Sequence, residues 1–286
     1  MLPPNQAISR RQLFVGAAGL AGAAGAGLAL AACGDSTTSF TVVQRYPSTA
    51  IATGDVRLPI SLADRTGTLT TTGPGTITGR VNVEGGAQVD TFRAIRRGAG
   101  LDVPYWSIEA TIAKPGLYEF VINGFTGEAT PFQVFDPATI KVASAGTALQ
   151  PFDTPTMAEP RGVDPVCTRL AGPCPFHAVS LTDALKSGKP VVYLVGTPAH
   201  CQTATCGPSL DVLIDVAKNY TDRAVFVHAE VYADQAGTKV APAFEAAGID
   251  YEPVLWITNA SGIVQRRVDV VWDHDELTAL MQAALA

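Results

Sequence analysis

The sequence contains little charge, few histidines and no block of basic residues. Only 16% of its 286 residues are charged and 47% are apolar, a balance typical of ordered globular domains rather than of disordered chains. The formal net charge is -6, and Arg93, Arg96 and Arg97 are the nearest approach to a basic cluster. We interpret these arginines as one solvated hairpin surface, so the sequence predicts no binding of nucleic acid.

The first 33 residues have the pattern of a targeting segment. Arg10 and Arg11 precede a weakly hydrophobic run, residues 15–32, that ends at Cys33. Residues 9–14 resemble a twin-arginine signal and residues 30–34 resemble a bacterial lipoprotein box. A membrane-spanning helix is the alternative, because the run is long enough for one. We expect export and a lipid on Cys33, which would anchor the protein on the extracytoplasmic face of the cell membrane. Loss of residues 1–32 removes two arginines and no acids, which gives a net charge of -6 - 2 = -8.

Cysteine is scarce, and no C-x-x-C pair occurs. With Cys33 assigned to lipid, two close pairs remain: Cys167 with Cys174, and Cys201 with Cys206. An even number in an exported chain indicates two disulfides; three pairings are possible, and proximity favours these two. Zinc is the competing interpretation, but C-x6-C followed by C-x4-C does not match the usual spacings of structural zinc sites. We therefore expect no metal and no cofactor, with the first pair as a structural staple rather than a redox relay.

The length and patterning predict two domains. Residues 40–136 contain about seven short apolar runs separated by Gly/Pro turns, which is typical of a β-sandwich of immunoglobulin type. Residues 137–177 form a Pro-rich linker that carries the Cys167/Cys174 loop. From 178 to 286, a capped short helix is followed by a strand, helix, strand, helix, hairpin and closing helix.

The second cysteine pair lies in the turn between a strand and a helix. The apolar run 191–195 predicts a buried strand, and the periodicity from Leu210 predicts a helix that begins near Pro208. A cysteine just before a helix is favoured as a thiolate, the reactive form. On a regular helix two residues five apart have Cα atoms roughly 8–9 Å from each other, whereas a disulfide needs about 4.4–6.8 Å. If Cys201 and Cys206 bond, residues 202–205 must therefore form a loop.

These elements, with a later strand that opens at Glu252-Pro253, resemble the thioredoxin superfamily over residues 178–286. Cys206-Gly207-Pro208-Ser209 is similar to the C-G-P-C turn of that family, with serine in place of the second cysteine. The resemblance implies an α/β fold and a cis proline at Pro253 that faces the cysteines. The acid that the family carries on the strand before the cysteines has no counterpart in residues 191–195.

The resemblance implies two alternative functions. In the first, the protein is a thiol–disulfide oxidoreductase acting on exported protein thiols or a redox partner protein, with Cys206 as the attacking thiol, Cys201 as its resolving partner and Pro253 beside them. In the second, it is a non-catalytic binding or structural lipoprotein whose two cysteine pairs are staples. His200 adjoins Cys201 and is a candidate to stabilise a thiolate, while His228 is interpreted as a packed core residue.

Overall fold

Alternation of apolar and polar residues builds the N-terminal part of the protein. In the strand from Thr76 to Val83, Ile77 and Val81 are buried while Thr78 and Arg80 are exposed, which is the two-residue period of a half-buried strand. The structure is a computed structural model that describes residues 40–286, so the predicted targeting segment and Cys33 lie outside the described residues.

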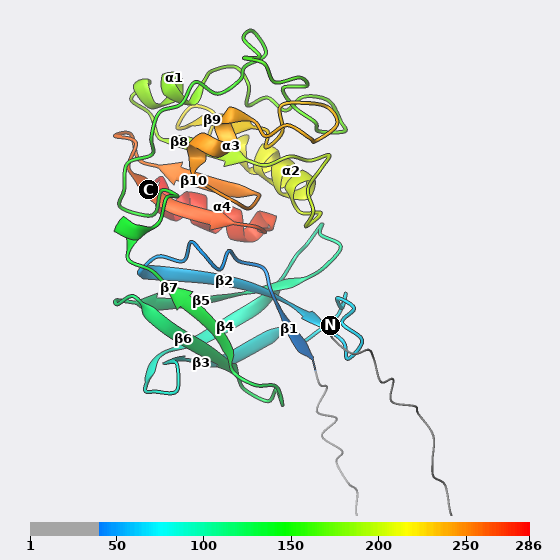
Figure 1. The fold of residues 1–286 in the computed structure, drawn as a ribbon, viewed down its shortest axis with the longest axis vertical. Helices are drawn as coiled ribbons and strands as arrows, with labels where there is room; N and C mark the ends of the chain where they lie inside the picture. Colours follow the sequence, from blue (N-terminus) through cyan, green and yellow to red (C-terminus); the bar gives the residue numbers. More distant parts are fainter. Residues whose placement is uncertain (1–39) are drawn as a thin grey trace, which may run out of the picture. The chain divides into compact units, whose positions relative to one another are not determined.

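Seven strands make up this part (Figure 1), close to the runs expected from the sequence. They are β1 (Thr41–Gln44), β2 (Gly54–Ala63), β3 (Thr76–Val83), β4 (Gln88–Arg97), β5 (Tyr105–Ile112), β6 (Gly116–Ile122) and β7 (Thr130–Val134).

The strands form one sheet, in the order β1-β2-β5-β4-β3-β6-β7, and all of their pairings are antiparallel. Two separate sandwiched sheets of immunoglobulin type are therefore not confirmed. The long strand β4 joins the two halves, because most of it pairs with β3 while its last residues, Arg96 and Arg97, pair with β5. The sheet thus curls in a barrel-like way around one core that includes Leu58, Trp106 and Phe120.

The C-terminal part alternates helices and strands in the predicted order. Its elements are α1 (Leu181–Lys186), β8 (Val191–Val195), α2 (Cys206–Ala217), β9 (Val225–Ala229), α3 (Pro242–Ala247), β10 (Val254–Thr258), β11 (Val264–Asp269) and α4 (His274–Ala284). Ser180 caps α1 and Asp273 caps α4, each by accepting a hydrogen bond from a backbone N–H three residues on. The four strands lie in the order β11-β10-β8-β9, with β8 parallel to β9 and antiparallel to β10.

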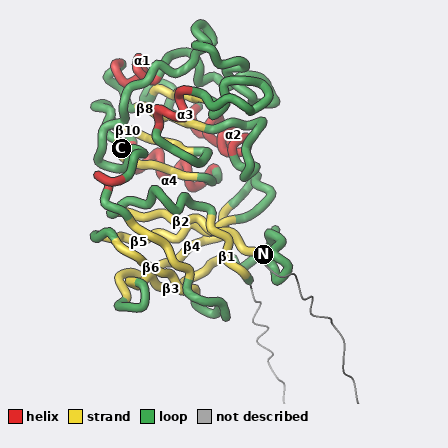
Figure 2. The backbone as a smooth tube through the Cα atoms, viewed as in Figure 1, coloured by secondary structure: helices red, strands yellow, loops and turns green. Residues whose placement is uncertain are grey.

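Both faces of this sheet are covered (Figures 1 and 2), which is why β8 is apolar at every position. Val192 and Leu194 face the apolar side chains of α2 and α4. Val191, Tyr193 and Val195 pack in the other core, to which α1 and α3 contribute. Among residues 40–286, no helix is long and apolar enough to cross a membrane.

The Pro-rich linker lies against the C-terminal part. It contains one short 3-10 helix, η1 (Pro137–Thr139), and otherwise follows an irregular path. The Trp256 indole N–H donates to the carbonyl of Ala143 over 3.0 Å, and the N–H of Gly146 donates to the carbonyl of Val264 over 2.8 Å. The linker therefore packs as part of the fold.

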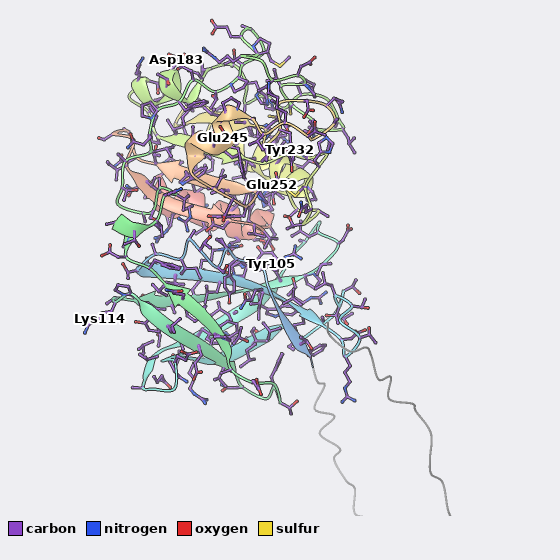
Figure 3. The ribbon with its side chains drawn as sticks, in the orientation of Figure 1. Tyr105, Lys114, Asp183, Tyr232, Glu245 and Glu252 are labelled. Atoms are coloured by element: carbon purple, nitrogen blue, oxygen red, sulfur yellow. A yellow bond between two sulfur atoms is a disulfide. The ribbon has the colours of Figure 1, made fainter. Side chains whose placement is uncertain are left out.

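A buried ion pair joins strand β2 to helix α4. The Arg57 guanidinium makes two bonds of 2.8 Å to the Glu276 carboxylate, and only 13% and 3% of these side chains are exposed. The Tyr105 hydroxyl, labelled in Figure 3, also donates to Glu276. Burial alone would raise the pKa of Glu276, but the charge of Arg57 and the bonds from Arg57 and Tyr105 hold that pKa below its ordinary value.

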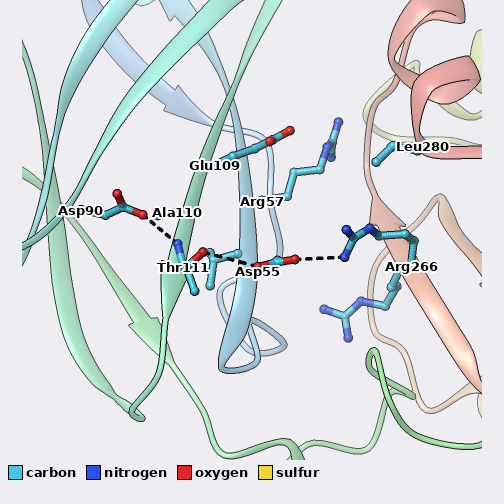
Figure 4. Close-up of a pocket in the computed structure, with 10 residues that line it drawn as sticks. Asp55, Arg57, Asp90, Glu109, Ala110, Thr111, Arg266 and Leu280 are labelled. Atoms are coloured by element: carbon cyan, nitrogen blue, oxygen red, sulfur yellow. Dashed lines mark hydrogen bonds and ion pairs between the residues drawn. The ribbon is translucent and has the colours of Figure 1, made fainter. Parts of the chain in front are cut away.

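A second, exposed ion pair connects the same two parts. Arg266 of β11 contacts Asp55 of β2 at 3.2 Å, with exposed fractions of 39% and 65% (Figure 4). The cavity beside it has a volume of about 330 Å³ and is lined by charged side chains and by none of the four described cysteines. Because the Arg266–Asp55 pair joins the same two parts in an exposed position, it is a control for the effect of removing the buried Arg57–Glu276 pair.

Substitution Arg57→Met is expected to lower the free energy of unfolding by about 3–5 kcal/mol, because it leaves Glu276 buried without its cation. Arg266→Met removes only a solvated pair and is expected to cost at most about 1 kcal/mol. Denaturant unfolding measures the free energy of unfolding of both variants.

The stabilisation by the buried pair should also depend on pH. Since folding lowers the pKa of Glu276, the contribution of the pair to the free energy of unfolding is present above pH 4.5 and is lost as pH falls through the folded-state pKa. If Arg57→Met and Arg266→Met lowered the free energy of unfolding equally, the greater stabilisation assigned to the buried pair would be wrong.

Candidate functional site

The cysteine turn connects β8 to α2, as predicted, but α2 begins earlier than expected. Its first residue is Cys206 rather than Pro208, which occupies the third position of the helix. A proline is tolerated there because the first N–H groups of a helix have no intrahelical partner. Residues 202–205 are non-helical, as the spacing requires, so Cys201 stays in the turn.

Cys201 and Cys206 form a disulfide with a Cα–Cα distance of 5.9 Å, which confirms the predicted pairing. The two sulfurs have different surroundings. Cys206 is only 1% exposed, at the start of α2, whereas Cys201 is half-buried. The N–H of Cys206 donates to the Cys201 sulfur over 3.2 Å, and the Thr203 hydroxyl lies 3.2 Å from the same sulfur. These contacts favour a negative charge on Cys201.

Pro253 lies next to the cysteine turn because β10, which follows it, pairs with β8. The pairing of β8 with β10 places Val195 opposite Val254, so the residues after β8 adjoin those before β10. A Cβ atom built on Gly196 would lie 3.1 Å from the Cβ of Pro253 and 3.7 Å from the Cβ of Cys206. The peptide bond between Glu252 and Pro253 is cis, which confirms that prediction.

A carboxyl group that we did not predict from the sequence lies beside the disulfide. An oxygen of Glu252 is within 4.8 Å of both sulfurs, and this carboxylate accepts a 2.5 Å hydrogen bond from the N–H of Thr197. Burial raises the pKa of Glu252 to about 7, against the smaller opposing effect of the Thr197 bond. The sequence does contain one indication of this position. Glu252 directly precedes Pro253, and a residue next to the proline that faces the cysteines also lies near them.

A groove of about 720 Å³ adjoins the cysteine turn, although neither sulfur of the disulfide is part of its lining. Its lining includes Gln202 and Thr203 from the cysteine turn together with Glu252. Apolar side chains complete it, among them Tyr232 and Phe244, and the segment 43–47 of the N-terminal part forms another wall. Its volume is within the usual range of ligand pockets.

The predicted disulfide between Cys167 and Cys174 is not formed: both are free and buried cysteines. They lie instead with His177 and His228, and one ligand atom from each of the four residues lies within 4.8 Å of the others. The prediction failed because spacing along the chain shows the two nearby cysteines, whereas His228 joins them only when β9 pairs with β8.

The two histidines named from the sequence have separate environments. A ring nitrogen of His200 lies 3.0 Å from the carbonyl oxygen of Gln235, and the ring packs edge-on against Tyr232. His200 is therefore turned toward the loop after β9 and is not in the group of Cys201, Cys206 and Glu252. His228 is fully buried, as expected for a core residue, but it also faces both free thiols.

No protein-family profile matches this sequence, and a search of curated proteins finds no match. Among solved structures, the chain is similar to a thiol:disulfide interchange protein of the thioredoxin family from Chlorobium tepidum TLS, with 15% sequence identity and a TM-score of 0.32. The match covers 49% of this chain and 100% of that protein. A TM-score this low does not indicate a shared function.

Proposed function

We propose that this protein is a thiol–disulfide oxidoreductase of the thioredoxin-like superfamily that acts on exported proteins. The observation that carries the proposal is a disulfide joining one half-buried and one fully buried sulfur, next to a carboxyl group whose pKa is about 7. A purely structural staple needs neither an accessible sulfur nor a proton carrier, whereas exchange chemistry uses both.

The accessibility of the sulfurs supports Cys201 as the residue that exchanges with substrate, the reverse of the assignment that the sequence favours. A substrate thiolate would attack the Cys201 sulfur, forming a mixed disulfide and breaking the bond to Cys206. Cys206 leaves as a thiolate and takes the proton of Glu252. A second substrate thiolate then attacks the substrate sulfur and releases Cys201 as a thiolate. The substrate gains a disulfide and the protein becomes a dithiol; the reverse sequence reduces a substrate disulfide.

The groove supports a polypeptide as the substrate. It combines apolar walls with the cysteine turn and extends to the segment 43–47, so a peptide that presents a thiol to Cys201 would contact both parts of the protein. Exported protein thiols, or a redox partner protein, are the proposed substrates.

With Cys206→Ser, we expect the Cys201 thiolate to attack partner disulfides and to stay joined to the partners as stable mixed disulfides, because the turn then has no second thiol to resolve them. The matched variant Cys201→Ser keeps only the buried Cys206 thiol in the turn and is expected to trap at least tenfold less. Non-reducing electrophoresis after isolation of the exported fraction measures both. Equal trapping by both variants would contradict the assignment of Cys201. A reduction potential below about -300 mV for the unmodified pair would instead mark a structural bond and support the non-catalytic alternative.

Glu252→Gln is expected to slow reduction of the Cys201–Cys206 disulfide by about tenfold or more, because general acid catalysis typically contributes ~10²–10⁴-fold. In the unmodified protein the rate constant, corrected for the thiolate fraction of the attacking reagent, should fall as pH rises through about 7, where Glu252 loses its proton. The variant should show no such step. Stopped-flow fluorescence with a small dithiol follows the reaction.

Glu245→Gln on α3 is the matched control, since it makes the same change at an exposed carboxylate outside the groove lining.

The pH dependence of stability tests the raised pKa of Glu252 independently of the exchange rate. The folded state keeps a proton that the unfolded state releases between pH 4.5 and about 7, so the free energy of unfolding should fall as pH rises through this window. A pH step that persists in Glu252→Gln would exclude Glu252 as the proton donor.

We also propose that the protein acts at the membrane surface, held by a lipid on Cys33. The support is the sequence alone: twin arginines, a weakly hydrophobic run and small residues directly before a cysteine. Cys33→Ala is expected to abolish incorporation of a radiolabelled lipid precursor and to release the protein from the membrane fraction. A variant that matures normally and stays with the membrane would contradict the anchor.

A further inference from the structure

The second cysteine pair belongs to a buried set of four ligand-type side chains. Cys167, Cys174 and His177 come from the end of the linker, and His228 comes from β9. Their exposed fractions are 6%, 4%, 2% and 0%. No sulfur or histidine of this group belongs to the Cys201–Cys206 site, and the exchange chemistry does not use them.

The distances within the group are close to those of tetrahedral coordination. Zinc–sulfur bonds of about 2.3 Å and zinc–nitrogen bonds of about 2.0–2.1 Å imply ligand–ligand separations of roughly 3.3–3.8 Å. His228 Nδ1 lies 3.4 Å from the Cys174 sulfur and 3.9 Å from the Cys167 sulfur. The same nitrogen is 3.1 Å from His177 Nε2. One ligand atom from each of the four side chains lies within 4.8 Å of the others, so small shifts of these atoms would bring a single ion within bonding distance of all four.

Hydrogen bonds around the group prepare its atoms to bind a cation. His228 Nε2 lies 2.8 Å from the carbonyl oxygen of Gly196; a carbonyl only accepts, so Nε2 carries the hydrogen and Nδ1 presents its lone pair to the thiols. The backbone N–H of Cys174 donates to the Cys167 sulfur over 3.4 Å, a contact that stabilises a thiolate. Both are typical supporting contacts of metal-bound histidine and cysteine.

Charge and ligand type select the ion. Two thiolates and two neutral imidazoles carry a charge of -2, so a divalent ion makes this buried group neutral, whereas an uncompensated buried charge is costly. A closed set of two cysteines and two histidines is a common donor set of structural zinc sites.

We propose that Cys167, Cys174, His177 and His228 bind one Zn²⁺ ion in a tetrahedral structural site. The ion fixes the end of the linker to β9. The site also supports the cysteine turn, because the Thr168 hydroxyl accepts a 3.1 Å hydrogen bond from the N–H of Ala199, and Gly196, the acceptor for His228, packs against Pro253.

Native mass spectrometry of the purified full chain is expected to show one zinc per chain together with the single Cys201–Cys206 disulfide. Replacement of zinc by Co²⁺ should give the strong visible absorption of tetrahedral cobalt with thiolate ligands. Removal of the ion with a chelator should lower the melting temperature, because the binding free energy of a structural ion contributes to folding.

Two variants locate the ion. His177→Ala is expected to lower zinc affinity at least tenfold and to change the cobalt spectrum, whereas His200→Ala, a comparable change beside the other cysteine pair, should keep both. The double variant Cys201→Ser/Cys206→Ser should also retain one zinc. The proposal would be overturned if the double variant lost the ion. It would also be overturned if the unmodified protein contained a Cys167–Cys174 disulfide and bound no zinc after that disulfide was reduced.

Discussion

The antiparallel pairing of β8 with β10 is the constraint on which the candidate chemistry depends. It places Val195 opposite Val254 in a sheet whose faces are both buried, so a shift of either strand by one residue would move all of its side chains to the opposite core and disrupt the packing of both. This fixed register brings the turn after β8 against the loop before β10. The Cys201–Cys206 disulfide and the Glu252 carboxyl group therefore meet although they lie about 50 residues apart in the chain.

Two carboxyl groups that are withdrawn from solvent in this protein have opposite pKa shifts, because their partners differ. Glu276 is enclosed together with Arg57, and the pair is held by two hydrogen bonds, so its pKa falls and it acts as a structural anion. Glu252 is half-buried and accepts from the N–H of Thr197, and its pKa rises to about 7. The difference between a structural and a reactive carboxyl group is set by what each one is buried with.

The two cysteine pairs are connected through Gly196. Its carbonyl accepts from His228, and a Cβ added to it would contact Pro253 and Cys206, so Gly196 lies between the proposed zinc site and the proposed exchange site. The four described cysteines are thus divided between a pair with one half-buried sulfur and a fully buried cluster with two histidines. Accessibility, rather than residue type, distinguishes the exchange chemistry from the structural role.

The sequence by itself determined most of the local structure. Alternating apolar residues predicted the strands of the N-terminal part, caps predicted α1 and α4, and the spacing of Cys201 and Cys206 required the loop between them. These features depend on neighbouring residues only, so a linear pattern contains them. The start of α2 was two residues off because a proline fits several positions in a first helical turn.

Only the tertiary structure decided which distant groups meet. It joined the seven N-terminal strands into one curled sheet, because the length of β4 allows it to pair on both halves. It brought Glu252 to the disulfide and His228 to Cys167 and Cys174. It also buried Cys206 and left Cys201 half-exposed. Such contacts arise from strand pairing and helix packing between segments far apart in the chain, and their residues show no common spacing that a sequence pattern would reveal.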